Sequence, residues 1–422
     1  MLTKPEYLEL WRKGSIAWNE WADSTDRAIV DFCEVDFSNE TKEMLGRPTI
    51  DFSQYRFPKS GDVYFTDAEF GEAFVNFRKT VFGKGRVHFL NCRFGSGGVV
   101  FDTTVFGDGD VNFESCLFDQ ALVTFENAKF GDGHHKFTDA RFKDSAVNFS
   151  GANFMGGKIE FKHCQFGEKA MFQSLYGLET MERFSFEGAS FEKLFTFSHA
   201  GEMGCPLDLR RTSIKHDVVV HDIRCTYEKV GRTSWQTYAS RFLFGWPRGD
   251  QPTWPWHAKA SNGDDSQCFR KLKELAVKNR NHAKALEFHI REIQSARGNG
   301  TTRLQDLGQF LYWLSCDYGR SVKRPLGWLV ALATGFAGIF AAIRRGGETL
   351  SFWESLGPGL TYSISNMLAF IPTGRSAMAQ SQDALFGNTV PYEVFALSGF
   401  QTVLAVILLF LLGLGLRNMY RV

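Results

Sequence analysis

The chain has 422 residues, of which 44% are hydrophobic, and a formal net charge of +1. This length allows two or three domains, and the nearly balanced charge argues against a general nucleic-acid binder. The eight cysteines include no Cys-x-x-Cys pair, which favours reduced side chains in a reducing compartment over a disulfide framework or a zinc site.

Residues 1–27 precede a repeat region and lack the apolar run of a secretory signal, so we expect no export by that route. They contain the stretch WNEW, Trp18 to Trp21. We expect a short helical cap here, because an uncapped end of a repeat array exposes apolar side chains and unpaired strand edges.

Phenylalanine then recurs at a fixed period. One series has a phenylalanine every twelve residues, and a second series lies five residues after the first. The two series are Phe65, Phe77, Phe89, Phe101, Phe113, Phe125, Phe137, Phe149 and Phe161, and Phe70, Phe82, Phe94, Phe106, Phe118, Phe130, Phe142, Phe154 and Phe166. Such self-similarity is typical of stacked repeats that bury their apolar faces against one another.

The positions two residues before each phenylalanine are also restricted. Before the first series they are branched aliphatic residues such as Val63, with His135 as the exception, and before the second they are small, as at Ala68 and Cys92. Alternation of period two places these residues on the inward side with the rings. With the Trp-rich lead-in, the pattern resembles the pentapeptide-repeat family, and the resemblance implies a right-handed quadrilateral β-helix.

The chain departs from that family's plain five-residue step, because steps of five and seven alternate. We predict Phe-cored coils of 24 residues made of two 12-residue units, which gives about eight coils over residues 28–223 at the spacing of paired strands. The segments GKG, GDG and GSGG are expected to widen corners, with glycine supplying a positive φ. We expect the helix to narrow or end where aliphatic residues replace phenylalanine, at Leu209, Ile214 and Val219.

Residues 224–263 are rich in proline and tryptophan and predict an irregular linker. Residues 264–320 have helical apolar spacing after a cap at Asp264 or Asp265, and the stretch KNRNH (Lys278 to His282) interrupts it. The pattern predicts a basic α-helical hairpin.

Residues 321–422 contain two apolar segments, Leu326–Ile343 and Val394–Leu416, with 18 and 23 uncharged residues. At about 1.5 Å per residue, both can cross a hydrocarbon core of about 30 Å. Between them, residues 350–378 are apolar but interrupted at Pro358 and Pro372. We expect a re-entrant loop here, with a half-helix from about 358 to 370 that enters the bilayer without crossing it.

Two spans around a half-helix resemble the pore modules of potassium-type channels. The whole chain resembles a bacterial group of pentapeptide-repeat membrane proteins with a C-terminal two-pass, ion-channel-like region, and DYGRSVKRPLGWL (Asp317 to Leu329) looks like the entry to its first span. The resemblance implies a bacterial inner-membrane protein and a homo-oligomeric pore, a tetramer by analogy. No TVGYG occurs, and the corresponding stretch reads SNMLAFIPTG, so potassium selectivity does not carry over.

The pore-lining candidates are the polar residues of the half-helix and of the turn beyond it, namely Thr361, Ser365, Asn366 and Thr373. The alternative is that these groups bond to neighbouring helices in a plugged or structural loop. Gly327, Ala331 and Gly335 recur every four residues and are candidates for close helix packing, either within one chain or between copies.

Basic residues suggest an orientation. Arg320, Lys323, Arg324, Arg417 and Arg421 flank the outer ends of the spans, against Arg344, Arg345 and Arg375 between them. The positive-inside rule then places both termini and the β-helix in the cytoplasm.

No phosphate-binding loop, nucleophile elbow or HExxH motif occurs, so we expect no enzyme, no cofactor and no metal site. The preferred hypothesis is an oligomeric, ion-channel-like pore in the lipid bilayer, with a β-helix that senses or docks an unidentified cytoplasmic protein. The first alternative is a membrane-anchored interaction scaffold. A third, an inhibitor that mimics DNA, rests on a small acidic excess, 25 acidic against 18 basic residues between positions 31 and 200.

Overall fold

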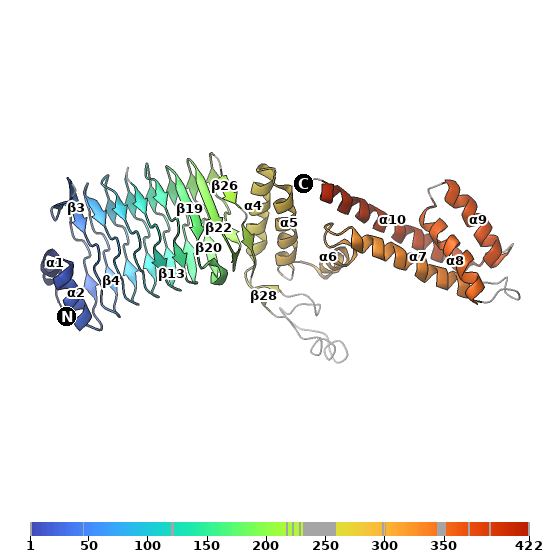
Figure 1. Cartoon of the computed structure of the whole chain (residues 1–422), viewed down its shortest axis with the longest axis horizontal. Coiled ribbons are helices and arrows are strands. Elements are labelled where there is room, and N and C mark those ends of the chain that lie inside the picture. Colours follow the sequence, from blue (N-terminus) through green and yellow to red (C-terminus); the bar gives the residue numbers. More distant parts are fainter. Residues whose placement is uncertain are drawn as a thin grey trace. The chain divides into compact units, whose positions relative to one another are not determined.

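The computed structural model describes residues 2–44, 46–119, 122–216, 218–221, 223–227, 229–230, 259–297, 299, 301–343, 352–369, 372–387 and 390–420. The chain forms two compact units, residues 1–279 with 284–299, and residues 280–283 with 300–422. The first unit contains the phenylalanine repeats and the second is helical (Figure 1).

Two helices cover the N-terminal end of the repeats, α1 (Lys4–Arg12) and α2 (Ser15–Ser24). The indole nitrogens of Trp11 and Trp18 each donate a hydrogen bond of 3.0 Å, to the carbonyl oxygens of Asp51 and Arg56. The ring of Trp18 stacks on Phe32 with centroids 6.0 Å apart. These contacts close the first coil, so the cap expected from the Trp-rich lead-in is present as a pair of helices.

The repeats form a β-solenoid of about seven turns with a Phe-rich buried core. Its short strands stack into long sheets (Figure 1). An eight-stranded sheet contains, in order, β1 (Val30–Asp31), β4 (Val63–Tyr64), β6 (Val87–His88), β9 (Val111–Asn112), β13 (His134–Lys136), β17 (Lys158–Glu160), β20 (Arg183–Ser185) and β24 (Leu207–Asp208). A six-stranded sheet contains β7 (Arg93–Phe94), β10 (Leu117–Phe118), β14 (Arg141–Phe142), β18 (Gln165–Phe166), β21 (Ser190–Phe191) and β25 (Ser213–Ile214).

A nine-stranded sheet contains β2 (Lys42–Met44), β3 (Arg47–Asp51), β5 (Phe74–Asn76), β8 (Val99–Val100), β11 (Val123–Thr124), β15 (Val147–Asn148), β19 (Ala170–Leu175), β22 (Phe195–His199) and β26 (Val218–His221). A further line consists of isolated bridges, such as Val81 with Val105, and of two short pairs. The pairs are β12 (Lys129–Phe130) with β16 (Asn153–Phe154) and β23 (Glu202–Met203) with β27 (Arg224–Cys225). The 3-10 helix η1 (Leu178–Thr180) lies in the loop before β20.

In the eight-stranded sheet, residues that are 24 positions apart in the repeat lie side by side on neighbouring strands. Val63 pairs with Val87, and Val87 pairs with Val111, all in parallel. The first coil is longer, since Val30 pairs with Val63 and the antiparallel β2–β3 hairpin is inserted between them. The first coil thus spans 33 residues between paired positions, nine more than the next one, and the solenoid has about seven turns where the sequence predicts about eight.

The rings form continuous stacks inside the solenoid. Phe89 lies parallel to Phe65 and to Phe113, with centroids 4.7 Å apart in both pairs. The ring of Phe101 meets Phe113 edge-on at 5.4 Å. Ring-on-ring and edge-to-face contacts are both favourable for aromatic pairs, so one comb of residues fills the core without gaps.

The small inward residues contribute hydrogen bonds as well as space. The Thr104 hydroxyl donates to the carbonyl oxygen of Phe77 at 2.7 Å, and the Cys116 thiol donates to that of Phe89, also at 2.7 Å. These polar side chains are fully buried, and each one is paired with backbone of the adjacent coil.

The glycines of the widened corners have a role different from the predicted one. Gly107, in a GDG segment, does not have a positive φ; a Cβ there would lie 2.0 Å from the carbonyl oxygen of Gly83 in the preceding coil. Glycine is therefore needed because two backbones approach closely. The prediction holds at Gly98 of GSGG, where φ is +89°, whereas most left-handed corner residues are not glycine, for example Asn91 and Ser115.

Strands continue to stack beyond Phe166, where the two phenylalanine series lose their regular spacing. Phe166 pairs with Phe191 and Phe184 with Leu207, so coils of slightly different length still align. β27 (Arg224–Cys225) pairs with β23, which carries the solenoid past the predicted boundary at residue 223. The antiparallel pair β28 (Lys229–Val230) and β29 (Lys259–Ala260) follows, and most of the predicted linker between these strands lies outside the described residues.

Helices α4 (Asp265–Lys278) and α5 (His282–Ala296) form the predicted hairpin, which is interrupted between Lys278 and His282. The apolar face of α4, with Phe269 and Leu272, joins the same buried cluster as the last coils of the solenoid. The hairpin therefore belongs to the first unit and covers the C-terminal end of the solenoid, a role that its sequence pattern did not indicate.

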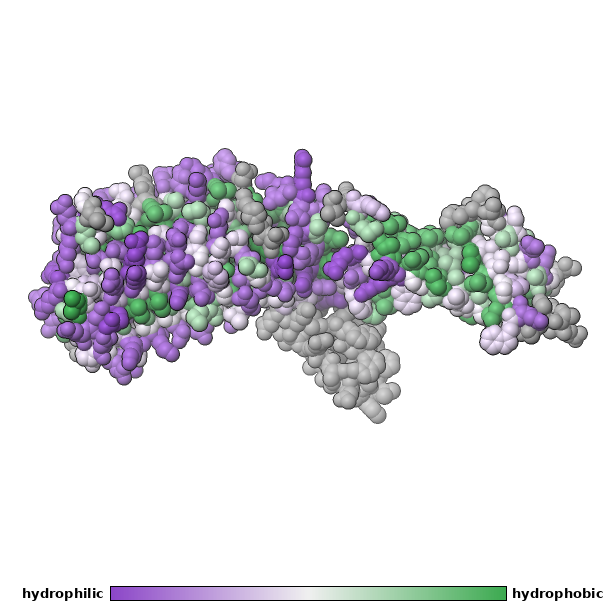
Figure 2. All heavy atoms as spheres, viewed as in Figure 1, coloured by the Kyte–Doolittle hydropathy of each residue, from purple (hydrophilic) through white to green (hydrophobic). Residues whose placement is uncertain are grey.

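The second unit consists of α6 (Arg303–Cys316), α7 (Lys323–Ile343), α8 (Phe352–Met367), α9 (Pro372–Phe386) and α10 (Tyr392–Tyr420). Helices α7 and α10 are long and apolar enough to cross a membrane. Figure 2 shows hydrophobic residues along much of the surface of this unit.

The segment between the two apolar helices differs in detail from the expected half-helix. α8 begins at Phe352 and continues through Pro358, which lies inside the helix, although it was expected in the first turn. Proline removes one backbone hydrogen bond, and the helix tolerates that loss. Pro372 does not merely end a helix but begins α9, where its missing N–H has no helical partner to lose.

Candidate functional site

Polar side chains meet in the interior of the second unit, between α7, α8 and α10. The Ser363 hydroxyl donates to the carbonyl oxygen of Ala333 in α7 at 2.8 Å. From α10, the Gln401 amide nitrogen donates to the Ser363 carbonyl oxygen at 3.1 Å and to its hydroxyl oxygen at 2.6 Å. One serine of α8 thus links the two long apolar helices.

A second set of bonds lies one turn away. The Tyr362 hydroxyl and the Ser398 hydroxyl are 3.2 Å apart, and the Asn366 amide nitrogen donates to Ser398 at 3.3 Å. The Thr402 hydroxyl donates to the carbonyl oxygen of Asn366 at 3.0 Å. We call Tyr362, Ser363, Asn366, Ser398, Gln401 and Thr402 the interhelical polar cluster. Its bonds hold α8 against α10, as hydrogen bonds between helices do in apolar surroundings.

Gln401 leaves one acceptor of this cluster unused. Its side chain is fully buried, and its Oε1 atom has no hydrogen-bond partner among the described residues. The amide cannot be turned over without loss, because the Ser363 carbonyl oxygen requires a donor and only the nitrogen side supplies one. The arrangement is therefore stable but not fully satisfied.

The structure separates the four pore-lining candidates. Thr361 is exposed, and its hydroxyl donates to the carbonyl oxygen of Gly357 in its own helix at 3.2 Å. Ser365 and Asn366 are buried, and Asn366 belongs to the interhelical polar cluster. Thr373 lies in the first turn of α9, and its side chain is outside the described residues. Of the three candidates whose side chains the structure describes, one is therefore exposed and two are buried.

The three small residues of α7 face away from the rest of the second unit. Gly327, Ala331 and Gly335 are exposed, and a Cβ added at either glycine would meet nothing within 4 Å. The contacts inside the chain use another side of α7, where Leu329 and Ala333 pack in a cluster with Met367 and Ala405. Among the described residues, α7 therefore packs within the chain through a side other than the one that carries these small residues.

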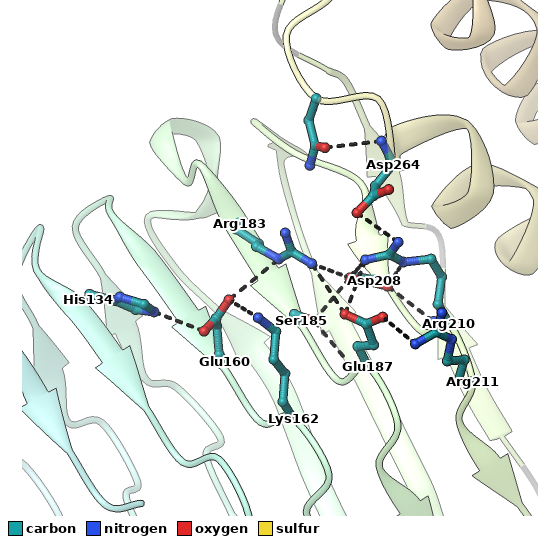
Figure 3. Close-up of polar contacts among 11 residues, drawn as sticks. His134, Glu160, Lys162, Arg183, Ser185, Glu187, Asp208, Arg210, Arg211 and Asp264 are labelled. Carbon is teal, nitrogen blue, oxygen red and sulfur yellow. Dashed lines mark hydrogen bonds and ion pairs between the residues drawn. The ribbon is translucent and has the colours of Figure 1, made fainter. Parts of the chain in front are cut away.

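Sequence reasoning missed an ionic network on the outer surface of the eight-stranded sheet (Figure 3). Glu160 of β17 accepts from Lys162 at 2.6 Å and lies 3.0 Å from the ring nitrogen of His134 on β13. Arg183 of β20 lies 3.6 Å from Glu160 and bonds to Asp208 of β24 at 2.9 Å. Four adjacent strands are thus cross-linked by polar contacts, of which those among Glu160, Arg183 and Asp208 are ion pairs of alternating sign.

Arg210 extends this network to the C-terminal hairpin. Its guanidinium bonds to Asp208 at 2.9 Å, to Glu187 at 3.2 Å and to Asp264, just before α4, at 2.8 Å. Burial raises the pKa of the Asp208 carboxyl, but the hydrogen bonds and charge of Arg210 outweigh burial and hold that pKa below its usual value. We call His134, Glu160, Lys162, Arg183, Glu187, Asp208, Arg210 and Asp264 the ionic ladder.

Asp265 lies beside the ladder in the first turn of α4 and behaves differently. Burial raises its pKa to about 6, assisted by the nearby charges of Asp264 and Asp208 and opposed by Arg183 and Arg210. The helix dipole favours an ionised carboxylate in the first turn of a helix. The raised pKa of Asp265 therefore comes from burial, which disfavours the charged form.

Several basic residues of the hairpin form ion pairs within it. Arg270 and Lys273 of α4 bond to Glu292 of α5 at 2.8 and 2.6 Å. The basic character of this segment therefore serves helix pairing, which reduces the charge left for an external anionic partner. Among the described residues, no group of three or more histidine, cysteine, aspartate or glutamate side chains is arranged to hold a metal ion.

The chain matches no protein-family model, no curated protein and no solved structure. The solenoid, its ionic ladder and the interhelical polar cluster of the second unit are the features of the chain that bear on its function.

Proposed function

We propose that the chain is a non-enzymatic, membrane-anchored interaction scaffold, in which α7 and α10 cross the bilayer and the β-solenoid carries the working surface. The single observation behind this choice is the interhelical polar cluster. Asn366 of α8, one of the polar groups that a pore would need, bonds to α10 within one chain, as Ser363 does to α7 and α10. A group bonded in this way stabilises the helical unit and is not available to an ion.

For the solenoid we infer a right-handed quadrilateral β-helix of the pentapeptide-repeat type, with coils of 24 residues. The parallel pairing of Val63 with Val87 and of Val99 with Val123 supports this coil length. Three sheets and a fourth line of bridges and short pairs support four sides. The buried phenylalanine with a small residue two positions earlier supports the repeat type.

We place the protein in a bacterial cytoplasmic membrane with both termini and the solenoid in the cytoplasm. The basic residues at the outer ends of the spans support this orientation, since Arg320, Lys323 and Arg324 precede α7 or begin it and Arg417 lies in the last turn of α10. Eight cysteines, seven of them buried and none in a disulfide, suit a reducing compartment.

The proposed partner of the solenoid is a protein and not a nucleic acid. The outer surface of the coils mixes acidic and basic side chains, many of them paired across coils, as Arg86 is with Asp62 at 2.7 Å. Pairing of this kind removes the one-sided charge that nucleic-acid binding or DNA mimicry requires.

An oligomeric, ion-channel-like pore is the second candidate, because one observation favours it. The small-residue face of α7, with Gly327, Ala331 and Gly335, is uncovered within the chain and lets another helix approach closely. Two spans cannot enclose a pore, so this function requires several copies, with a tetramer as the analogue of the channel plan. Among the pore-lining candidates whose side chains are described, Thr361 on α8 is the exposed one.

Reconstitution separates the two candidates. The scaffold proposal predicts that the purified chain resists alkaline extraction from vesicles, yet passes no current in planar bilayers. A pore predicts current that changes with Thr361→Asp, while Thr334→Asp on the exposed side of α7 serves as a matched control. Sustained, Thr361-dependent current would overturn the scaffold proposal, and release of the chain by alkali would overturn both candidates.

A further inference from the structure

Helix α6 has an apolar face that the second unit leaves open. Leu304, Leu307, Leu311 and Leu314 recur at helical spacing along one side, and the side chains of Leu304 and Leu311 are 78% and 52% exposed. The opposite side carries the amides of Gln305 and Gln309 together with Tyr312 and Trp313, whose rings have both an apolar body and a polar group. A capping box at Thr302 and Gln305 fixes the start of the helix. The exposed leucines therefore belong to a well-formed amphipathic helix.

Two bonds tie the C-terminal half of α6 to the beginning of α7. The Arg324 guanidinium donates to the carbonyl oxygen of Trp313 at 2.9 Å and lies 5.3 Å from the centre of its ring. The Trp328 indole nitrogen donates to the carbonyl oxygen of Leu314 at 3.2 Å. Helix α6 thus lies at the level of the first two turns of one apolar helix.

A third bond connects the same region to the other apolar helix. The Asn418 amide nitrogen, near the end of α10, donates to the carbonyl oxygen of Gly319, just after α6. Gly319 has a positive φ of 78°, and a Cβ there would meet Tyr312, Asn418 and Leu414 at 3.1 to 3.2 Å. The end of α6 is therefore fixed where α7 begins and α10 ends, which is one boundary of any bilayer that both helices cross.

We propose that α6 is an interfacial helix, with its leucine face against the acyl chains at the edge of the bilayer and its polar face toward water. This inference rests on the proposed membrane anchor. Amphipathic helices of this kind place their apolar face about 5–10 Å into the boundary between headgroups and acyl chains. Arg320 and Lys323, exposed beside the helix, lie where anionic phospholipid headgroups are found.

The partner is a lipid surface and not a protein, because the depth of α6 is set by the two apolar helices and because exposed leucines and exposed basic residues occur together, as the layered chemistry of an anionic bilayer requires. As an interfacial helix, α6 also fixes the orientation of the scaffold at the point where the chain enters the membrane.

Depth-dependent fluorescence quenching tests this inference on the full chain in vesicles of phosphatidylcholine and phosphatidylglycerol. Cys33 is the one cysteine that is not buried, so Cys33→Ser provides the background for labelling. A polarity-sensitive dye is placed on Leu304→Cys, on Leu311→Cys or on the matched polar-face control Gln305→Cys. A fourth label, Val406→Cys at the middle of α10, reports on the anchor itself, since this side chain is 50% exposed.

We expect nitroxides near the headgroup end of the acyl chains to quench the labels at positions 304 and 311 at least twofold more than the label at 305, which aqueous iodide should quench instead. Spin-labelled phosphatidylglycerol should quench position 311 more than spin-labelled phosphatidylcholine does, and Lys323→Gln should remove that difference.

Each remaining outcome overturns a defined claim. If iodide quenches positions 304 and 311 while a deep nitroxide quenches position 406, the anchor stands and the interfacial helix is wrong. If neither lipid nitroxides nor iodide reach positions 304 and 311, protein covers the leucine face, and the lipid partner is wrong. If the deep nitroxide fails to quench position 406, the membrane anchor and this inference both fail.

Discussion

Replacement of Phe113 by alanine perturbs the middle of the phenylalanine stack. The ring is fully buried, lies parallel to Phe89 and Phe137 at 4.7 and 4.9 Å, and meets Phe101 and Phe125 edge-on at 5.4 and 5.5 Å. A buried Phe→Ala change costs about 3–5 kcal/mol when the cavity cannot collapse. We expect about 4 kcal/mol here, since rings of the adjacent coils are held by their own strands.

The variant Phe113→Leu separates the cost of lost ring contacts from the cost of an empty cavity. Leucine keeps most of the volume but loses the four closest ring pairs, and at about 0.5 kcal/mol each this loss is about 2 kcal/mol; the fifth ring, Phe106, is farther away at 6.2 Å. Leu122→Ala is the control in the neighbouring segment, because Leu122 is 53% exposed and its truncation should cost less than about 0.5 kcal/mol.

Native-state hydrogen exchange is the suitable assay, because a chain with two units does not unfold in a single transition. Opening of β9 and of its neighbours β6 and β13 should become about a thousandfold more frequent in Phe113→Ala and about thirtyfold more frequent in Phe113→Leu, since 1.4 kcal/mol is about tenfold. The cap helices should exchange as before, because each coil contacts only its neighbours. Equal exchange in the alanine variant and the wild type would refute the stacked core as the source of stability.

Other predictions concern the corners, the ladder and the polar cluster. Gly107→Ala should destabilise the solenoid by about 1–3 kcal/mol in the same exchange assay, because the added Cβ meets the Gly83 carbonyl oxygen at 2.0 Å, whereas Gly308→Ala in α6 meets nothing within 4 Å and should not destabilise. Asp265 has a folded-state pKa of about 6, above its unfolded value of about 3.9, so its ionisation opposes folding as pH rises through this window. Asp265→Asn should therefore stabilise the α4 region at pH 7 and make its thermal unfolding less dependent on pH between about 4 and 6, and an unchanged pH profile would argue against a buried carboxyl. Ser363→Ala should lower the thermal stability of the second unit in detergent by about 0.6–2 kcal/mol, because it removes a bond between helices. The double variant with Ser363→Ala and Gln401→Leu should recover part of that loss, because it also removes the unpaired amide oxygen. Additive losses in the double variant would contradict the bonded pair.

Much of the solenoid could be predicted, because a period of two within each step fixes which side chains face inward. The burial of Phe65 follows from that alternation, whereas the pairing of Val63 with Val87 joins residues two 12-residue units apart. The predicted reason for glycine at the widened corners, a positive φ, is wrong at Gly107, because the distance between the backbones of adjacent coils cannot be read from the sequence. Gly107 is required by such a distance and not by its own φ.

The place of Arg183 in the ionic ladder could not be predicted, because this residue lies where the repeat loses its spacing. Glu160 pairs with Ser185, and Ser185 pairs with Asp208, at intervals that depart from the earlier 24 residues in opposite directions. A fixed period of 24 still places Asp208 in the column of Glu160, because the two departures cancel, but it places Glu182 and not Arg183 beside Lys158. The one available signal was the alternation of sign at positions that precede buried residues.

In the second unit, composition predicts which segments are apolar helices but not how each helix is rotated about its axis. The polar residues of α8 were identified, yet their partners Ser398 and Gln401 lie more than thirty residues away on α10. The rotation of α8 about its axis is set by the packing of the whole bundle. Thr361, Ser365 and Asn366 share a face by helical spacing, yet Thr361 lies at the surface and the other two lie in the interior.

The most direct test of the account is a density map of the full chain in a lipid nanodisc. We predict that α7 and α10 cross the disc, that the solenoid lies entirely outside it, and that Asn366, Ser398 and Gln401 are enclosed within each chain with no continuous water-filled path beside them. A map with both apolar helices outside the lipid would contradict the anchor. A ring of copies around an open channel lined by α8 would contradict the scaffold.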